Sequence, residues 1–279
     1  MRGLFAADAP FFLIAGPCLL EDDGLNLRIA DALAEASVAL DVPVIFKASF
    51  DKANRSLSDA ERGPGLEVGL ERLATVARRS ELPVLTDIHE PAQAAPAAAV
   101  CAALQIPAFL SRQTDLIEAA GATGRPVNIK KGQWMAPADV TGAVAKARTA
   151  GAAGVAVTER GTFFGYGDLV VDMRSFARLR EATGAPVIFD GTHSVQRPGR
   201  AAGASGGDPE HTPALVRAAA AAGIDGLFLE VHPDPAGAPS DRATMLPLDR
   251  LEPLLREVLA VRGALEALAR PVTVEAAGV

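Results

Sequence analysis

The stretch Val42-Pro-Val-Ile-Phe46-Lys47-Ala-Ser-Phe-Asp-Lys52-Ala-Asn54-Arg55-Ser56 joins an apolar run to a dense group of polar side chains. The apolar half predicts a buried strand, because its consecutive apolar positions suit a strand covered on both faces. The polar half then places two ammonium groups, a guanidinium, an amide and two hydroxyls at the end of that strand. Arg offers a rigid fork of donors and Lys a compact charge, so this stretch predicts a loop that holds phosphate and carboxylate oxygens.

Similar apolar runs recur along the chain, and most are bounded by Pro or Gly. The eight expected strands are Phe12–Ala15, Val42–Phe46, Pro83–Thr86, Ala103–Ile106, Pro126–Ile129, Val155–Thr158, Pro186–Phe189 and Gly226–Leu229. Between them, apolar positions at helical spacing predict helices at Leu25–Leu40, Leu66–Arg79, Pro91–Val100, Asp139–Ala150, Met173–Ala182, Pro213–Ala222 and Leu251–Leu268. We expect Asp22 or Asp23 to begin the first helix, and Gly151, Gly184 and Gly223 to end three others.

Eight strands alternating with helices in 279 residues predict an α/β fold, a single-domain (β/α)8 TIM barrel spanning residues 1–279, with a frayed tail from about 270. The alternative is an open, doubly wound sheet. The glycine fingerprint of dinucleotide binding would then follow the first strand, and Gly16-Pro17-Cys18 does not supply it. This absence favours the barrel.

Bulk composition narrows the class of protein further. Apolar residues make up 49% of the chain, which excludes extensive disorder, and no apolar run approaches the roughly 20 residues that cross a bilayer. We find no signal peptide and expect a cytoplasmic protein without a membrane partner. The net charge of −7 argues against a nucleic-acid surface but not against small anionic substrates. The two cysteines, Cys18 and Cys101, do not suggest a disulfide framework.

Polar and ionisable residues lie in or just after the expected strands. They are Cys18, Lys47, Asp87, His89, Gln105, Lys130, Lys131, Glu159, Arg160, Asp190, His193, Glu230 and His232. In a barrel these positions converge on the C-terminal mouth, where the chemistry of such folds takes place. Two connections, Ala48–Pro64 and Ser194–Asp208, exceed the usual length of a βα loop. The glycines of the second would permit motion and so indicate a closing lid; the alternative is a solvated surface loop.

A metal site is a second hypothesis at this mouth. Cys18, His193, Glu230 and Asp241 follow the first, seventh and eighth strands, which are neighbours around a closed barrel. One sulfur, one imidazole and two carboxylates suit Zn²⁺, Fe²⁺ or Mn²⁺ better than Mg²⁺ or Ca²⁺. Their spacing matches no compact ligand motif, and a buried cysteine is otherwise a small hydrophobe, which is the role expected of Cys101.

The chain also resembles the 3-deoxy-D-manno-octulosonate 8-phosphate (KDO-8-phosphate) synthase family from about Phe12 to about Leu259. The resemblance rests on ordered blocks such as Ile14-Ala-Gly-Pro-Cys-Leu-Leu-Glu21, Lys47–Ser56, Leu85-Thr-Asp-Ile-His-Glu-Pro91, Val127-Asn-Ile-Lys-Lys-Gly-Gln133, Thr192-His-Ser-Val-Gln196 and Phe228-Leu-Glu-Val-His-Pro-Asp-Pro235. It implies a (β/α)8 homotetramer that condenses phosphoenolpyruvate (PEP) with D-arabinose 5-phosphate in lipopolysaccharide synthesis.

The resemblance also assigns roles to individual residues. It implies that PEP is held by Lys47, Lys52, Gln105, Lys130 and Arg160, and arabinose 5-phosphate by Asn54, Arg55, Ser56 and Asp87, with Ser49 among the substrate-binding residues. Catalytic roles are implied for Lys47, Lys52, Asp87, Lys130 and His193. The metal-independent branch has Asn in place of Cys18, so Cys18 implies the metal-dependent branch, with Cys18, His193, Glu230 and Asp241 as ligands of Zn, Fe or Mn.

Some positions depart from the family pattern, and other functions stay open. Leu57 stands where a second Ser is common, Gly191 replaces a common Ala, and Asp241 is followed by Arg242-Ala243 instead of Gly-Pro. The alternatives are a DAHP or sialic-acid-type synthase that joins PEP to another aldose, a Schiff-base aldolase, and a non-catalytic barrel that binds a sugar phosphate.

Overall fold

A computed structural model of the chain describes residues 3–6, 9–53, 61–201 and 204–269. Eight parallel strands close into a barrel in the order β1 (Phe12–Gly16), β2 (Val44–Lys47), β3 (Val84–Asp87), β4 (Ala103–Ile106), β5 (Val127–Lys130), β6 (Val155–Glu159), β9 (Val187–Asp190) and β12 (Gly226–His232). Pairing of β1 with β12 completes the ring, with Gly16 opposite Glu230. The predicted (β/α)8 fold is confirmed, and all eight strands lie where the apolar runs placed them.

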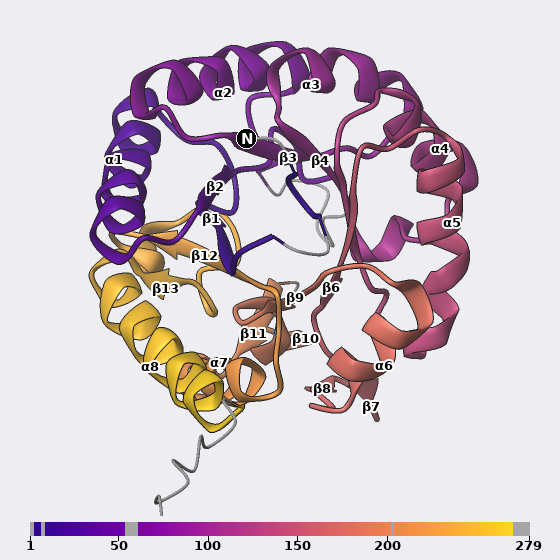
Figure 1. The fold of residues 1–279 in the computed structure, drawn as a ribbon. Helices are drawn as coiled ribbons and strands as arrows, with labels where there is room; N and C mark the ends of the chain where they lie inside the picture. Colours follow the sequence, from indigo (N-terminus) through magenta and orange to yellow (C-terminus); the bar gives the residue numbers. More distant parts are fainter. Residues whose placement is uncertain (1–2, 7–8, 54–60, 202–203, 270–279) are drawn as a thin grey trace, which may run out of the picture.

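Helices surround the barrel in a continuous outer layer (Figure 1). They are α1 (Asp23–Leu40), α2 (Leu66–Ser80), α3 (Ala94–Val100), α4 (Thr114–Ala122), α5 (Thr141–Thr149), α6 (Ser175–Thr183), α7 (Thr212–Ala221) and α8 (Leu251–Ala269). Asp22 begins α1, where its side chain accepts a hydrogen bond from the Leu25 amide, and Gly184 ends α6 with a φ of 58°. Gly151 and Gly223 each follow the residue that ends their helix. No helix of the described residues combines the length and the apolar character needed to cross a membrane.

Alternate residues of each strand face two different cores. Leu13 and Ala15 of β1 belong to the large cluster between the strands and the helices, whereas Phe12 and Ile14 belong to a smaller cluster inside the barrel. Phe5 joins the inner cluster and lies 5.7 Å from the Phe12 ring, between ring centroids. Because Phe12 begins its strand, this contact fills the N-terminal end of the barrel and leaves the C-terminal end for polar side chains.

Four features were not predicted from the sequence. The helix α4 follows β4, and two antiparallel hairpins follow later strands: β7 (Thr162–Phe164) with β8 (Asp168–Val170), and β10 (Gln196–Ala201) with β11 (Ala204–Gly207). A short strand β13 (Leu246–Pro247) also pairs with β12. The Ser194–Asp208 segment, expected to be a loop, is therefore largely a hairpin at the barrel mouth. The expected tail from about 270 lies outside the described residues.

Candidate active site

The ends of neighbouring barrel strands bring most of the predicted site residues to the C-terminal mouth. Lys47, Asp87 and Lys130 are the last residues of β2, β3 and β5, and Glu230 lies in β12. Their side chains are all buried. Such a concentration of buried charge is costly unless the charges are paired and hydrogen-bonded, which is what the contacts below provide.

The first part of the site lies over β2 and β3. The Lys47 ammonium donates to Ser49 Oγ at 3.0 Å and to Glu230 Oε1 at 3.2 Å. Lys52 Nζ lies 2.9 Å from the same Ser49 hydroxyl, which in turn donates to Asp87 Oδ1. Burial alone lowers the pKa of Lys52, but the acidic groups of Cys18, Glu230 and other neighbours outweigh this effect and raise the pKa above its ordinary value. Two buried cations and a carboxylate are thus held together through one hydroxyl.

Asp87 is also held by His89, which follows the same strand. Its Oδ2 lies 3.2 Å from His89 Nε2, and its Oδ1 lies 3.9 Å from Lys47 Nζ. Burial raises the pKa of the Asp87 carboxyl, but Lys47, His89 and Lys52 reverse this effect and hold the pKa well below its usual range. Asp87 is therefore an ionised acceptor placed at the edge of a cationic site.

The second part lies over β5 and β9. The Lys130 ammonium donates to Asp190 Oδ2 and sits 3.4 Å from the centroid of the Phe228 ring. The same Asp190 oxygen lies 2.8 Å from His193 Nδ1. Burial lowers the pKa of Lys130, although the Asp190 charge opposes this shift. The sequence places Asp190 at a strand end without indicating its role, and the structure shows that it joins Lys130 to His193.

Arg160, directly after β6, is another buried cation. Its Nη2 donates to Gln196 Oε1 at 2.7 Å, while its buried Nη1 finds no hydrogen-bond acceptor among the described residues. A buried guanidinium N–H that lacks an acceptor is rare in proteins, because leaving a charged donor unpaired costs several kcal/mol, on the order of 2–3. The Nη1 group is a ready donor for an anion that enters the mouth.

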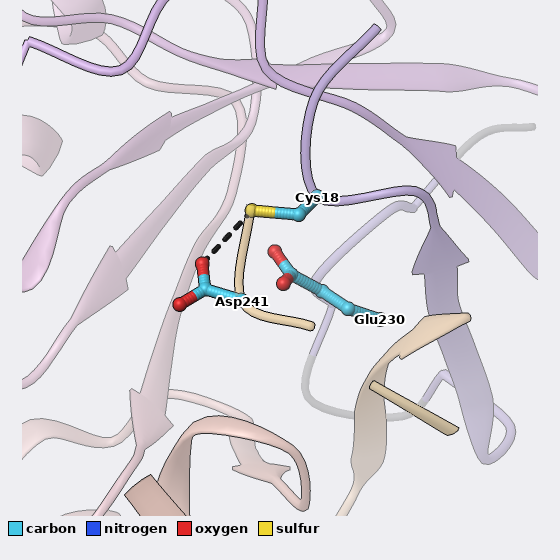
Figure 2. A group of neighbouring side chains, drawn as sticks. All are labelled: Cys18, Glu230 and Asp241. Carbon is cyan, nitrogen blue, oxygen red and sulfur yellow. Dashed lines mark hydrogen bonds between the residues drawn. The ribbon is translucent and has the colours of Figure 1, made fainter. Parts of the chain in front are cut away.

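A candidate metal centre lies beside these cations. Ligand atoms of Cys18, Glu230 and Asp241 lie within 4.8 Å of one another, and Figure 2 shows the three side chains turned toward a common point from separate segments. The Cys18 sulfur is 2.9 Å from Asp241 Oδ2. His193 Nε2 is at the border of this group, 3.5 Å from Glu230 Oε2 and 3.9 Å from Asp241 Oδ2. The changed sequence after Asp241 does not prevent its carboxylate from reaching the group.

The chemistry of these four side chains fits a divalent cation. Glu230 Oε2 is buried and has no hydrogen-bond partner within the described part of the chain. Burial, Asp241 and Glu230 all raise the pKa of the Cys18 thiol well above its ordinary value. A bound cation would reverse both features, because it accepts the lone pair of the carboxylate and stabilises the thiolate. Soft sulfur with imidazole and carboxylate again points to Zn²⁺, Fe²⁺ or Mn²⁺.

Other predicted residues stand apart from these contacts. Gln105 is buried and accepts a hydrogen bond from Asn128, which is itself held by Thr158. Lys131, fully buried, donates to the carbonyl oxygens of Gly132 and Met135 and so supports the β5 exit. Cys101 is a buried residue of the outer core, as expected, and its pKa is raised to about 12 by burial.

His232 contacts Glu21 instead of the buried cations, and part of the connection after β2 lies outside the described residues. His232 Nε2 lies 3.1 Å from Glu21 Oε1 and ties β12 to the segment after β1. Asn54, Arg55, Ser56 and the departure at Leu57 lie outside the described residues. The residues on either side of this gap are described, and the Lys52 amide donates to the Arg62 carbonyl at 2.8 Å.

The fold and the site together define a (β/α)8 barrel with buried cations at its mouth and a candidate metal centre beside them. The chain belongs to the DAHP synthetase I family, which matches residues 3–266.

Its relatives in this family carry a narrower name. The chain is 54% identical over 257 residues to the 2-dehydro-3-deoxyphosphooctonate aldolase of Syntrophotalea carbinolica, and 52% identical over 256 residues to that of Desulfosudis oleivorans; each match covers 92% of both proteins. It is 54% identical over 250 residues to the protein of this name from Nitratidesulfovibrio vulgaris, covering 90% of this chain and 91% of the relative. This name is another one for KDO-8-phosphate synthase, so the resemblance found in the sequence is confirmed.

Proposed function

We propose that this protein condenses phosphoenolpyruvate with D-arabinose 5-phosphate and water, giving 3-deoxy-D-manno-octulosonate 8-phosphate and inorganic phosphate. The observation that carries the proposal is the set of four buried cations, Lys47, Lys52, Lys130 and Arg160, at the mouth of the barrel. Two anionic substrates must be brought together there, and buried cations offset the mutual repulsion of the substrates. The relatives named 2-dehydro-3-deoxyphosphooctonate aldolase support this choice of substrates.

The PEP end of the site would lie between β5 and β6. Arg160 Nη1, without an acceptor in the described residues, supplies a guanidinium donor for the phosphate. Asp190 holds the Lys130 ammonium at the end of β5, and Lys130 would contact the same phosphate. Lys47 and Lys52 would face the phosphate and carboxylate from β2, and Gln105 would line the site.

The sugar end would lie toward β2 and β3. Asp87, ionised and fixed by Ser49 and His89, would accept a hydrogen bond from a sugar hydroxyl. The resemblance gives Asn54, Arg55 and Ser56 to the phosphate of the sugar, with Arg55 as the principal contact. In the reaction, C3 of PEP attacks the aldehyde carbon, positive charge develops at C2, water adds there, and the bisphosphate intermediate then loses phosphate. These side chains position the two substrates and stabilise the changing charges.

We further propose that Cys18, His193, Glu230 and Asp241 hold a divalent metal, Zn, Fe or Mn. The grouped ligand atoms support this, as does the Glu230 oxygen, which has no hydrogen-bond partner among the described residues. The metal, when bound, would polarise a carbonyl or a water by Lewis-acid chemistry. Asp190 would hold His193 from its Nδ1 side and so keep Nε2 turned toward Glu230 and Asp241.

The choice of sugar is tested by incubating the purified protein with PEP and separate sugar phosphates, and measuring phosphate release. We expect arabinose 5-phosphate to be used far better than erythrose 4-phosphate; a preference for erythrose 4-phosphate would instead indicate a DAHP synthase. Borohydride trapping with the substrates tests the Schiff-base alternative, and we expect no labelled lysine. A cytoplasmic location is expected from the N-terminal sequence, and a homotetramer from the resemblance. Light scattering coupled to size exclusion measures the oligomeric state.

A further inference from the structure

Gln196, the first residue of β10, lies between the anion-binding and metal-binding parts of the site. Its Oε1 accepts a hydrogen bond from Arg160 Nη2 at 2.7 Å, and its Nε2 donates to Asp241 Oδ1 at 2.8 Å. The side chain is buried, with 7% of the residue exposed. One amide therefore connects a proposed PEP ligand to a proposed metal ligand.

The chemistry of the two partners fixes the orientation of this amide. A guanidinium can only donate hydrogen bonds, and an ionised carboxylate can only accept them. Rotating the amide of Gln196 by half a turn would place N–H groups against Arg160 and an oxygen against Asp241. Both contacts would then be repulsive in a buried setting, so the position of Arg160 decides which end of Gln196 faces Asp241.

The same contact determines which oxygen of Asp241 faces the metal site. Gln196 engages Oδ1, while Oδ2 lies beside the Cys18 sulfur and 3.9 Å from His193 Nε2. Asp241 also has a left-handed backbone, with a φ of 49°, which sets the direction of its side chain. Gln196 thus holds Asp241 by the carboxylate oxygen other than the one that lies beside Cys18 and His193.

We propose that Gln196 is a positioning residue that couples the anion site at Arg160 to the affinity of the metal site at Asp241. An anion on Arg160 would restrain the guanidinium, keep the amide of Gln196 in place and so tighten metal binding. By linkage, the metal would tighten PEP by the same factor. This inference deepens the proposed function and rests on it, because it takes the metal and PEP sites as given there.

A second bridge runs in parallel, from Lys130 through Asp190 to His193. It joins another proposed PEP ligand to another proposed metal ligand. Removing Gln196 should therefore reduce the coupling between the two sites without abolishing it.

The test is a titration of the metal-free protein with Co²⁺, followed by thiolate-to-metal absorption, with and without PEP and in the absence of sugar. Gln196→Met keeps the length of the side chain and removes both hydrogen bonds. Gln113→Met makes the same change at an exposed position and serves as the control. None of these measurements depends on turnover.

In the wild type we expect PEP to lower the Co²⁺ dissociation constant by about fivefold or more. Gln196→Met should raise the Co²⁺ dissociation constant by roughly 10-fold, the lower end of what lost outer hydrogen bonds cost a metal site. In Gln196→Met, the factor by which PEP lowers the Co²⁺ dissociation constant should fall to less than about half of its wild-type value. Gln113→Met should match the wild type in both respects.

Two results would overturn the inference: no effect of PEP on Co²⁺ affinity in the wild type, or an undiminished effect in Gln196→Met. Thermal unfolding shows whether Gln196→Met is folded. If it is not, the same titrations are made with Gln196→Leu. A wild type that binds no Co²⁺ at all would count against the proposed metal site itself. Normal Co²⁺ binding with unchanged coupling in the variant would count against the role of Gln196 alone.

Discussion

Replacing Lys130 by methionine separates the structural from the functional role of a buried cation. The ammonium donates to Asp190, and methionine keeps the length of the side chain but not its charge. Asp190 would retain its hydrogen bonds from the Thr192 amide and hydroxyl and from the His193 amide and ring. Breaking a buried ion pair costs about 3–5 kcal/mol, and these remaining donors place the expected loss of stability near about 3 kcal/mol.

The double variant Lys130→Met/Asp190→Asn removes the uncompensated charge as well. We expect it to recover about 1–2 kcal/mol of the lost stability, since the two residues are in direct contact and their effects are not additive. It should not recover PEP affinity. Loss of one charged hydrogen bond to phosphate costs about 1.5–3 kcal/mol, which corresponds to a roughly 10- to 150-fold weaker dissociation constant.

Urea unfolding at fixed protein concentration and calorimetric titration with PEP measure the two effects separately. A Lys130→Met protein whose PEP affinity stays within about twofold of the wild type would remove Lys130 from the phosphate site. A double variant no more stable than Lys130→Met would contradict the assignment of the stability loss to an unpaired Asp190.

Three further substitutions have clear expected outcomes. Cys18→Asn should weaken Co²⁺ binding by more than about 100-fold, because it removes a direct ligand, whereas Cys101→Ala should leave metal binding unchanged; equal effects would contradict the metal site. Arg55→Ala should raise the KM for arabinose 5-phosphate by roughly 10-fold or more, and a loss confined to PEP would refute its assigned role. Gly16→Ala should destabilise the fold by more than about 3 kcal/mol in urea unfolding, since a Cβ there would lie 2.1 Å from a carbonyl oxygen of β2. Gly142→Ala should instead raise the free energy of unfolding by up to about 1 kcal/mol, because Gly142 lies in a helix and no atom crowds an added Cβ there. An unchanged free energy of unfolding in Gly16→Ala would disprove the close approach of Gly16 to β2.

The barrel was predictable because parallel strands buried on both faces leave a simple pattern in the sequence. Ala103–Ile106 has the predicted bounds, and the other strands differ from prediction only at their ends. The hairpin of Thr162–Phe164 with Asp168–Val170 leaves no such pattern, because its residues are largely exposed. The helix Thr114–Ala122 is short, with a narrow buried face, and was also missed.

The location of the site was predictable for a topological reason, whereas its internal contacts were not. Every strand of a parallel barrel ends at the same mouth, so Lys47, Lys130 and Glu230 had to converge once the strands were assigned. That Asp190 joins Lys130 to His193, and Gln196 joins Arg160 to Asp241, depends on side-chain directions within the folded barrel. Position within Thr192-His-Ser-Val-Gln196, one of the blocks of the family resemblance, was the only sequence signal for Gln196.

The proposed reaction and metal site are tested most directly by phosphate release from PEP and arabinose 5-phosphate by the purified protein, before and after treatment with a chelator. We expect release only when both substrates are present, loss of this activity in the metal-free protein, and its return on addition of Zn²⁺, Fe²⁺ or Mn²⁺. Full activity after complete metal removal would contradict the role given to Cys18, His193, Glu230 and Asp241. An absence of phosphate release under every metal condition would contradict the proposed reaction itself.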